Sequence, residues 1–349
     1  MATEKTTILD IARLTGLSKG TVDRVLHNRG EVSRKSYEKV MAVVREKGYK
    51  PNPYAALLAK GEEKAVALLL PSHSPGSYWD LATSEVDRLA EEIGAMGISI
   101  VHFRYNQYDP LSFQQTCRNL LESCPSGVVI APMYKEETLR FTALLSAEGI
   151  PYVFIDTKLE TEDYLAYFGI PAYKSGYLCA DMLCQGKKIT DALMIRIRRD
   201  KQQQSDPTVE RRAGFLDYMQ EHHPRCTVRS LFIDPSDPSA TDDILEAFFT
   251  EFPKVRHLVM FNSRIHLVVP FLERHPEKEF RVVGFDNLEA NVDALIKGTV
   301  NVLIAQHPER QVSQAIRALA EHIVFKREPG RKDNYMHMDL LTRYNAEDY

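Results

Sequence analysis

The sequence predicts an α/β protein in two parts, a small helical head at the N-terminus and a larger, two-lobed body of parallel α/β sandwiches. Residues 1–60 contain three short amphipathic helical patterns. From Ala65 onward, β-branched runs alternate with amphipathic stretches, which is typical of parallel sheets. About ten such runs are more than one sheet comfortably holds, so we expect two lobes with a cleft between them.

The composition excludes several classes of protein. The 349 residues are 44% hydrophobic and 26% charged, as in ordinary globular proteins. No apolar run approaches the ~18 residues of a membrane span, and the polar first residues lack the apolar core of a secretory signal. The 5 cysteines are odd in number and scattered, which argues against a disulfide framework. We therefore expect a cytoplasmic protein that does not bind membranes.

Charge is distributed unevenly along the chain. Residues 1–60 carry 12 Lys and Arg against 6 Asp and Glu, whereas the remainder carries 32 basic and 42 acidic residues. A basic head on an acidic body indicates that the head binds a polyanion such as nucleic acid.

Three helices are predicted in the head, each with a capping residue before it and a stop signal after it. Their spans are Ile8 to Gly16 after Thr7, Lys19–His27 after Ser18, and a third from Ser33 to Gly48. Their apolar faces are Ile8, Ile11, Ala12 and Leu14; Val22, Val25 and Leu26; and Tyr37, Val40, Met41 and Val44. Two short helices joined by a tight turn and supported by a third form a helix-turn-helix domain, although another three-helix bundle fits the local pattern too.

The stretch Ile8–Asn28 resembles the DNA-binding head of lac-repressor-type (LacI/GalR family) regulators, and the match continues through Val32-Ser33 and Gly48–Asn52. In that family the first residues of the second helix contact base edges in the major groove. By position, the resemblance assigns base reading to Lys19, Gly20 and Arg24. It assigns phosphate contacts to Thr21, His27, Asn28 and Ser33.

The predicted recognition helix leaves alternatives open. Lys19 and Arg24 are also compatible with solvated charges, but an arginine can pair with two acceptors of guanine, which favours base reading. Gly20 has no side chain that could contact a base. We therefore expect recognition of the operator, the DNA site that the protein binds, to depend less on that position. Asp23 departs from the family pattern, and either accepts from a cytosine amine or pairs with Lys19.

Residues 51–62 are predicted to form a linker with a short helix that begins after Pro53. Such a helix is unstable alone. The resemblance implies a hinge helix that forms on the operator and pairs with its twin in the minor groove, with Ala55 at the close approach and Leu58 as a wedge between base pairs. Alternatively, Leu58 packs on the body. Ala56 stands where the family often has a basic or amide residue.

The body is predicted to alternate strands and helices. The predicted strands are Ala65–Leu70, Ser99–Arg104, Gly127–Ala131, Tyr152–Ile155, Ala192–Arg196, Ser230–Ile233, His257–Phe261, Arg281–Phe285, Val300–Ile304 and Met336–Thr342. The predicted helices are Leu81–Met96, Leu111–Glu122, Lys135–Glu148, Ala172–Gln185, Pro207–His222, Asp242–Glu251, Ile265–His275, Leu288–Lys297 and Pro308–Phe325.

Polar side chains follow several of these strands at their carboxyl ends, where open α/β sheets bind ligands. They are Asp156, Asn262, Asp286 and Gln306, with Arg211 at the start of a helix and Tyr78-Trp79 after the first strand. Carboxylates, amides and a guanidinium beside aromatic rings suit a polyhydroxylated ligand such as a sugar. Loop ends, however, also collect polar residues that bind nothing.

The body is similar to the same family and to the periplasmic ribose-type sugar-binding proteins. The matching stretches are Ile150–Asp156, Arg211–Phe215, Leu258–Asn262, Val282–Asp286, Ile304–Pro308 and Leu340–Arg343. In the sugar-binding relatives, the resemblance implies, the ligand positions are Tyr78, Trp79, Asp156, Arg211, Asn262, Asp286 and Gln306. Thr157 replaces a common arginine, and Asp234–Ser239 lacks the aromatic residue that relatives often have.

A basic cluster follows one strand near the predicted cleft and is either a solvated loop or a site for an anionic effector such as a uronic acid or sugar phosphate. Its members are Arg196, Arg198, Arg199 and Lys201. A metal site at His222, His223 and Cys226 is disfavoured, because a histidine pair at a helix end is usually exposed structure. We expect no cofactor and no metal. The chain also lacks a P-loop, a nucleophile elbow and a metal triad, which argues against an enzyme.

We therefore expect a transcription regulator, repressor or activator, whose operator affinity is controlled by a small-molecule effector, a sugar or sugar derivative, bound in the cleft. Residues 1–50 are predicted to bind DNA, residues 51–62 to form the hinge, and residues 63–349 to bind the effector and dimerise. A homodimer on a pseudo-palindromic double-stranded operator is expected, because one recognition helix contacts few base pairs. The alternative, a sugar-binding protein without a DNA role, leaves the basic head unexplained.

Overall fold

The computed structural model describes residues 8–26, 32–47, 64–161, 163–197, 207–235, 237–347 and 349, without the side chains of Ile8, Leu9 and Asp23. The chain divides into two compact units, Met1–Glu62 and Glu63–Tyr349.

The head contains the three expected helices, α1 (Ile8–Thr15), α2 (Lys19–Leu26) and α3 (Arg34–Glu46). Gly16 adopts a φ of +65° at the end of α1, a conformation that glycine reaches without strain. The Ser18 and Ser33 hydroxyls each accept a hydrogen bond of 3.2 Å from the backbone N–H three residues on. Both serines therefore cap their helices as predicted. Thr7 and Gly48 lie outside the described residues.

The core of the head is smaller than the apolar patterns predict. Ile11, Val22, Val25 and Val40 are buried together. Two residues assigned to the apolar faces are instead exposed, Leu14 at 51% and Tyr37 at 47%. Three short helices enclose a single small core, so positions at the edge of each apolar stripe stay outside it.

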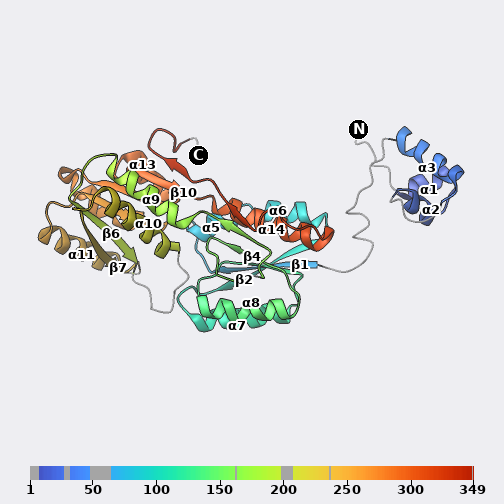
Figure 1. Cartoon of the computed structure of the whole chain (residues 1–349), viewed down its shortest axis with the longest axis horizontal. Coiled ribbons are helices and arrows are strands. Elements are labelled where there is room, and N and C mark those ends of the chain that lie inside the picture. The colour runs from blue at the N-terminus through green and yellow to red at the C-terminus, as the bar shows by residue number, and fades with distance from the viewer. Residues whose placement is uncertain are drawn as a thin grey trace. The chain divides into compact units, whose positions relative to one another are not determined.

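The first lobe of the body is built on a parallel sheet with strand order β11-β5-β4-β3-β1-β2. Its strands are β1 (Lys64–Pro71), β2 (Ile98–Tyr105), β3 (Gly127–Ile130), β4 (Tyr152–Ile155), β5 (Ala166–Gly169) and β11 (Asp333–Tyr335). Its helices are α5 (Tyr78–Thr83), α6 (Val86–Gly94), α7 (Pro110–Glu122), α8 (Lys135–Ala147) and α14 (Pro308–Phe325). Helices α7 and α8 cover one face of the sheet, and α6 and α14 cover the other (Figure 1).

The second lobe has the strand order β12-β10-β9-β8-β6-β7, parallel except for β12. Its strands are β6 (Asp191–Ile197), β7 (Thr227–Ile233), β8 (His257–Met260), β9 (Arg281–Phe285), β10 (Val302–Ala305) and β12 (Asp339–Leu341). Its helices are α9 (Ala172–Cys184), α10 (Pro207–His222), α11 (Pro238–Glu251), α12 (Val269–Arg274) and α13 (Glu289–Lys297), with 3₁₀ turns Ile265–Val268 and Pro276–Lys278. Side chains along β6 alternate between the two apolar clusters on either side of this sheet.

Several predicted elements need correction. The predicted strand Met336–Thr342 is too long, because only its part Asp339–Leu341 is a strand, β12, and residues 336–338 connect it to β11 in the other sheet. The predicted helix Leu81–Met96 is two helices, α5 and α6, and Ile265–His275 is a 3₁₀ turn followed by α12. Strands β5 and β11 were not predicted. The β-propensity of a segment predicts that its chain is extended, but it does not predict the sheet in which that segment pairs.

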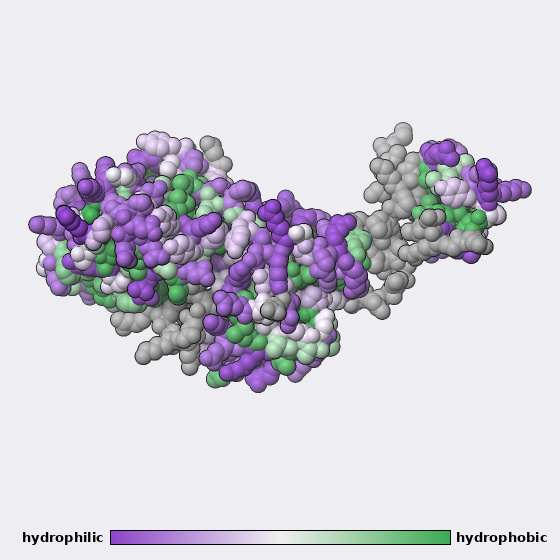
Figure 2. Space-filling view, viewed as in Figure 1, coloured by the Kyte–Doolittle hydropathy of each residue, from purple (hydrophilic) through white to green (hydrophobic). Residues whose placement is uncertain are grey.

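The chain passes between the lobes at residues 170–171, 306–307 and 336–338. Each sheet thus directs the carboxyl ends of its parallel strands towards the space between the lobes. Hydrophilic residues dominate the face of the body seen in Figure 2, whereas the central strands are buried and apolar. No helix in the described part of the chain is long and apolar enough to cross a membrane.

Candidate functional site

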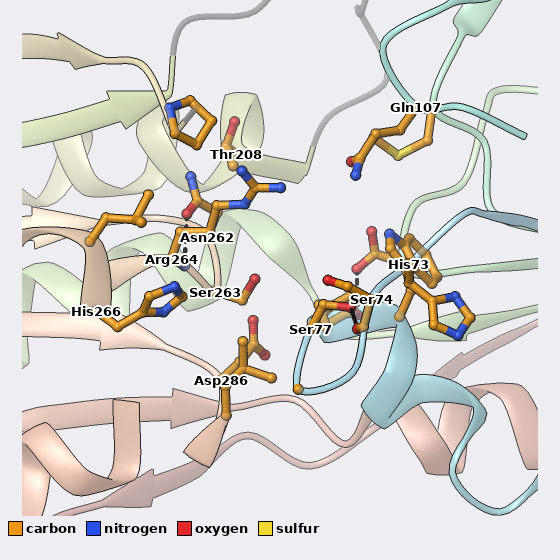
Figure 3. Close-up of a pocket in the computed structure, with 18 of the residues that line it drawn as sticks. His73, Ser74, Ser77, Gln107, Thr208, Asn262, Ser263, Arg264, His266 and Asp286 are labelled. Atoms are coloured by element: carbon orange, nitrogen blue, oxygen red, sulfur yellow. Dashed lines mark hydrogen bonds between the residues drawn. The ribbon is translucent and has the colours of Figure 1, made fainter. Parts of the chain in front are cut away.

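A cleft of about 650 Å³ lies between the lobes and is lined by the loops that follow the strands of both sheets. Asn262, Ser263, Arg264 and His266 lie on one side, Ser74, Ser77 and Gln107 on the other, and Asp286 at the base (Figure 3). A cavity of this size lies within the usual range of small-molecule sites.

The seven cleft residues predicted from the sequence all line this cavity. They are Tyr78, Trp79, Asp156, Arg211, Asn262, Asp286 and Gln306. Four of them, Asp156, Asn262, Asp286 and Gln306, follow the carboxyl ends of strands, and the other three lie on α5 and α10. Contacts of all seven with a ligand stay a prediction. Other lining residues were missed, among them Tyr108, Arg264 and His266, although they too follow the ends of β2 and β8.

Asp156 is held rigidly on the first-lobe side of the cleft. It follows β4 with a φ of +63°, an uncommon conformation for a residue other than glycine. Its backbone N–H donates to the Gln311 Oε1 at 3.0 Å, and its carboxylate accepts from the Tyr78 hydroxyl at 2.9 Å. Burial, with the nearby charge of Asp156, raises the pKa of Tyr78. The phenol therefore stays protonated and donates.

Arg211 and Asp286 form the deepest polar contacts of the second-lobe side. Arg211 is 2% exposed, and its Nη1 donates to the Phe261 carbonyl at 2.7 Å. Its Nη2 donates to the Gln306 Oε1 at 2.9 Å, and the Gln306 Nε2 donates in turn to Asp286 at 2.9 Å. The guanidinium also lies over the Phe285 ring, 4.5 Å from its centroid.

Asp286 is 1% exposed and, like Asp156, has a left-handed backbone, with a φ of +67°. Burial raises its pKa to about 7 against the lowering effects of Arg211 and Gln306. A buried acid with a shifted pKa and a strained backbone in a cleft is typical of a functional site.

Close packing of α9 and α10 places Arg211 at the cleft. A Cβ added at Gly176 on α9 would lie 1.8 Å from the Arg211 carbonyl oxygen, and one at Gly214 on α10 would lie 2.0 Å from the Tyr173 carbonyl oxygen. Only glycine permits this approach. The position of the arginine is therefore set by two glycines that the sequence analysis did not single out.

Asn291 ties the second-lobe loops together and was also missed. It is fully buried on α13, and its amide nitrogen donates to the carbonyls of Ser263, Phe285 and Asp286. Its Oδ1 accepts from the backbone N–H of His266 at 3.2 Å. The loops after β8 and β9 are thus fixed to each other by one amide side chain.

The aromatic pair at the first-lobe side is packed edge to face. The Tyr78 and Trp79 rings lie 5.0 Å apart with an interplanar angle of 86°, and Trp79 is buried. Trp79 still lines the cleft, so stacking on a ligand stays a prediction.

In the head, Lys19, Gly20 and Arg24 are exposed on α2. The Arg24 Nε donates to the Gly20 carbonyl at 3.2 Å, and the Thr21 hydroxyl lies 2.9 Å from that of Ser18. Ser33 is exposed at the start of α3. The predicted contacts of His27, Asn28, Ala55 and Leu58 lie outside the described residues, and so does the side chain of Asp23, whose alternatives stay open.

The predicted basic cluster is not part of the cleft where the structure describes it. Arg196 lies over the exposed Phe232 ring, 4.6 Å from its centroid, and is absent from the cleft lining. Arg198, Arg199 and Lys201 lie outside the described residues. Within the described ranges, no group of three or more His, Cys, Asp or Glu residues could hold a metal ion.

Comparison with known proteins places both units in families. Residues 7–52 match the model of the family described as bacterial regulatory proteins, lacI family. The periplasmic binding protein domain matches residues 66–327. The HTH-type transcriptional regulator DegA of Bacillus subtilis is 32% identical over 152 residues, which cover 43% of this chain and 44% of that protein. The chain thus aligns with less than half the length of this relative.

Two solved structures share the fold of the body. A putative LacI transcriptional regulator from Bacteroides fragilis has a TM-score of 0.78 and 34% identity, covering 82% of this chain and 100% of that one. A carbohydrate transporter solute binding protein from Agrobacterium radiobacter, in complex with D-arabinose, has a TM-score of 0.70 and 18% identity, covering 82% and 97% of the two chains. The chain therefore belongs to the LacI family of bacterial transcription regulators, and its body is a periplasmic binding protein domain.

Proposed function

We propose that the protein binds operator DNA through its head and that a carbohydrate or carbohydrate derivative, bound in the cleft, sets the operator affinity. The observation that carries the proposal is the convergence of Asp156, Arg211 and Asp286 on one cleft, in a chain whose first unit is a LacI-family head. Transcription regulation, not catalysis, is the function of this family.

The chemistry of the cleft supports a polyhydroxylated effector. Carboxylates accept hydrogen bonds from sugar hydroxyls and the guanidinium donates to them, and such charge-assisted bonds are the strong ones. Trp79 supplies an aromatic surface for the apolar face of a sugar ring. The sugar-bound structure from Agrobacterium radiobacter supports the same ligand class, because its fold matches this body.

Control of DNA binding follows from contacts to both lobes. Asp156 belongs to the first lobe and Asp286 to the second, so an effector that binds both favours one arrangement of the lobes. An effector shifts operator affinity only by its differential affinity for the two arrangements, typically about 5–150-fold.

For the head, we propose base reading by Lys19, Gly20 and Arg24. Phosphate contacts are assigned to Thr21, His27, Asn28 and Ser33, and minor-groove contacts to Ala55 and Leu58. The working division of the chain is residues 1–50 for DNA, 51–62 for the hinge and 63–349 for effector and dimer. A homodimer doubles the number of base pairs read, so a monomer in sedimentation at micromolar concentration would contradict this part of the proposal.

The test combines operator selection with effector titration. The full-length protein selects operators from random double-stranded DNA, and the best site is titrated with and without each member of a sugar panel. Asp286→Ala is expected to bind the operator as the wild type does and to ignore the sugar that moves it, because Asp286 lines the cleft and not the head. The control Asp243→Ala changes an exposed acid on α11 and is expected to respond normally. Failure to enrich any DNA, or a normal response of Asp286→Ala, would contradict the proposal.

A further inference from the structure

Arg264 lines the cleft but has no role in the sugar binding proposed above. It follows β8, is half-buried, and donates from its Nη2 to the Tyr108 hydroxyl at 2.9 Å. Tyr108 is exposed in the loop after β2, so this hydrogen bond joins the two lobes across the cleft. The Arg264 backbone N–H donates to the Asn262 Oδ1 at 3.0 Å, which fixes the start of the arginine beside a predicted ligand position.

Among the described residues, neither arginine of the cleft forms an ion pair with an acidic side chain, although the charge of Arg211 lowers the pKa of Asp286. Arg211 is bonded to a main-chain carbonyl and an amide, and Arg264 to a phenol. The Asp156 carboxylate accepts a hydrogen bond from the Tyr78 hydroxyl, and that of Asp286 accepts one from the Gln306 amide. A guanidinium in a recessed site normally pairs with a carboxylate or phosphate, because its planar fork matches their oxygens.

Two further features make the second-lobe side favourable to an anion. Pro207 and Thr208 line the cleft at the N-terminus of α10, a helix of 16 residues whose first turn presents partial positive charge. Independently, the Nε of Arg211 is buried without a hydrogen-bond partner. A buried unpartnered donor is costly, so a side chain that lines the cleft is left with one unsatisfied donor.

The ionisation of the other side chains favours an anion too. Because burial raises the pKa of Asp286 to about 7, this carboxyl group carries only part of a negative charge near neutral pH. Burial lowers the pKa of His266, so that histidine adds no charge there. Among the described residues that line the cleft, Arg264 is thus the cation on the outer second-lobe side.

We propose that the effector carries a carboxylate or phosphate group and that Arg264 binds it, exchanging the Tyr108 hydroxyl for the anion. This inference rests on the proposed function, because the remainder of the effector occupies the sugar positions at Asp156, Arg211 and Asp286. It places the anion at a residue that lines the cleft, whereas the sequence left open an anion site at the cluster around Arg196, most of which lies outside the described residues.

The test is calorimetry of the full-length protein with matched pairs of neutral and anionic sugars. The pairs are glucose with glucuronate, galactose with galacturonate, and glucose with glucose 6-phosphate. We expect the anionic member of at least one pair to bind about tenfold or more tightly than its neutral partner, as one charged hydrogen-bonding group contributes. The uronate and phosphate arms distinguish the two sources of the anion.

Two variants assign the effect to its residue. Arg264→Gln is expected to remove the preference for the anionic member, so that the affinities for the anionic and neutral members differ by no more than about twofold. Arg212→Gln, which changes an exposed arginine next to Arg211 on α10, is expected to leave both affinities unchanged.

The outcomes of these experiments distinguish a failure of the anionic effector from a failure of the proposed carbohydrate function. Equal or tighter binding of the neutral members overturns the anionic effector while the carbohydrate proposal stands. An equal loss of both affinities in Arg264→Gln also overturns it, and assigns Arg264 to holding the lobes through Tyr108. Absence of binding by every sugar overturns the anionic effector and the proposed carbohydrate function together.

Discussion

The buried carboxyl group of Asp286 should make the stability of the body depend on pH, and Asp286→Asn should remove that dependence. Asp286 is 1% exposed, and burial raises its pKa from 3.8 to about 7. Asparagine has nearly the same shape, keeps an oxygen to accept from Gln306, and cannot ionise. The comparison therefore isolates the free energy of holding a charge at this position.

The sign follows from proton binding. Between pH 3.8 and 7 the unfolded chain has an ionised Asp286 while the native protein keeps it protonated, so the free energy of unfolding falls as pH rises. The slope is about 1.4 kcal/mol per pH unit, and it ends near pH 7 when the native group ionises too. Relative to a residue that stays neutral, Asp286 thus lowers stability by about 2 kcal/mol at pH 5 and about 4 kcal/mol at pH 8.

The measurement is urea unfolding of both full-length proteins between pH 5 and 8. Fluorescence of the single tryptophan, Trp79, reports on the body and not on the head. The advantage of Asp286→Asn should grow by about 2.5 kcal/mol over this range, whereas Asp243→Asn, at an exposed site, should show a flat difference. A difference of constant size, or a variant less stable than the wild type at pH 8, would refute the reasoning.

Three other changes test the packing and the head. Gly176→Ala should destabilise the body by about 1–3 kcal/mol in the same urea assay, because its Cβ would strike backbone atoms of α10, whereas Gly94→Ala meets nothing within 4 Å and should be tolerated. Ser33→Ala should lower the stability of α3 by about 1 kcal/mol, seen as faster amide hydrogen exchange in the DNA-free protein; unchanged exchange would contradict the capping role. Arg24→Ala should relax preference at one base pair at a cost of about 1–3 kcal/mol, while Lys35→Ala should weaken all sequences alike; uniform loss in both would refute base reading by Arg24.

The location of the cleft residues could be predicted because parallel strands leave little freedom at their carboxyl ends. Once the strands ending near Ile155, Phe261, Phe285 and Ile304 are recognised, the polar residues that follow them must meet at one edge. The bounds of β4 and β9 agree with the prediction residue for residue, since both are apolar runs buried on both faces.

Partners that depend on distant segments could not be predicted. Gln311 lies on α14 and Asn291 on α13, where an amide in a helix is usually a solvated residue, yet both are buried and bind loops of the cleft. The sequence did not indicate a role for Arg264 in the cleft, because its partner, Tyr108, is 156 residues away in the chain. Leu14 and Tyr37 were misassigned for a related reason, since helical periodicity gives the apolar face but not the size of the core that it meets.

The hydrogen bonds of the cleft also show why its residues suit a regulator. The backbone N–H of Asp156 donates to Gln311, the amide of Gln311 donates to the Gln306 carbonyl, and the side chain of Gln306 donates to Asp286. This continuous series runs from the first lobe to the second through residues 306–307, one of the segments where the chain crosses between them. The series passes between the lobes at Gln306, whose main-chain carbonyl bonds to the first-lobe side and whose side chain bonds to the second. An effector that contacts both aspartates therefore binds at the two ends of this series of hydrogen bonds. Part of its binding free energy then favours one arrangement of the two lobes over the other.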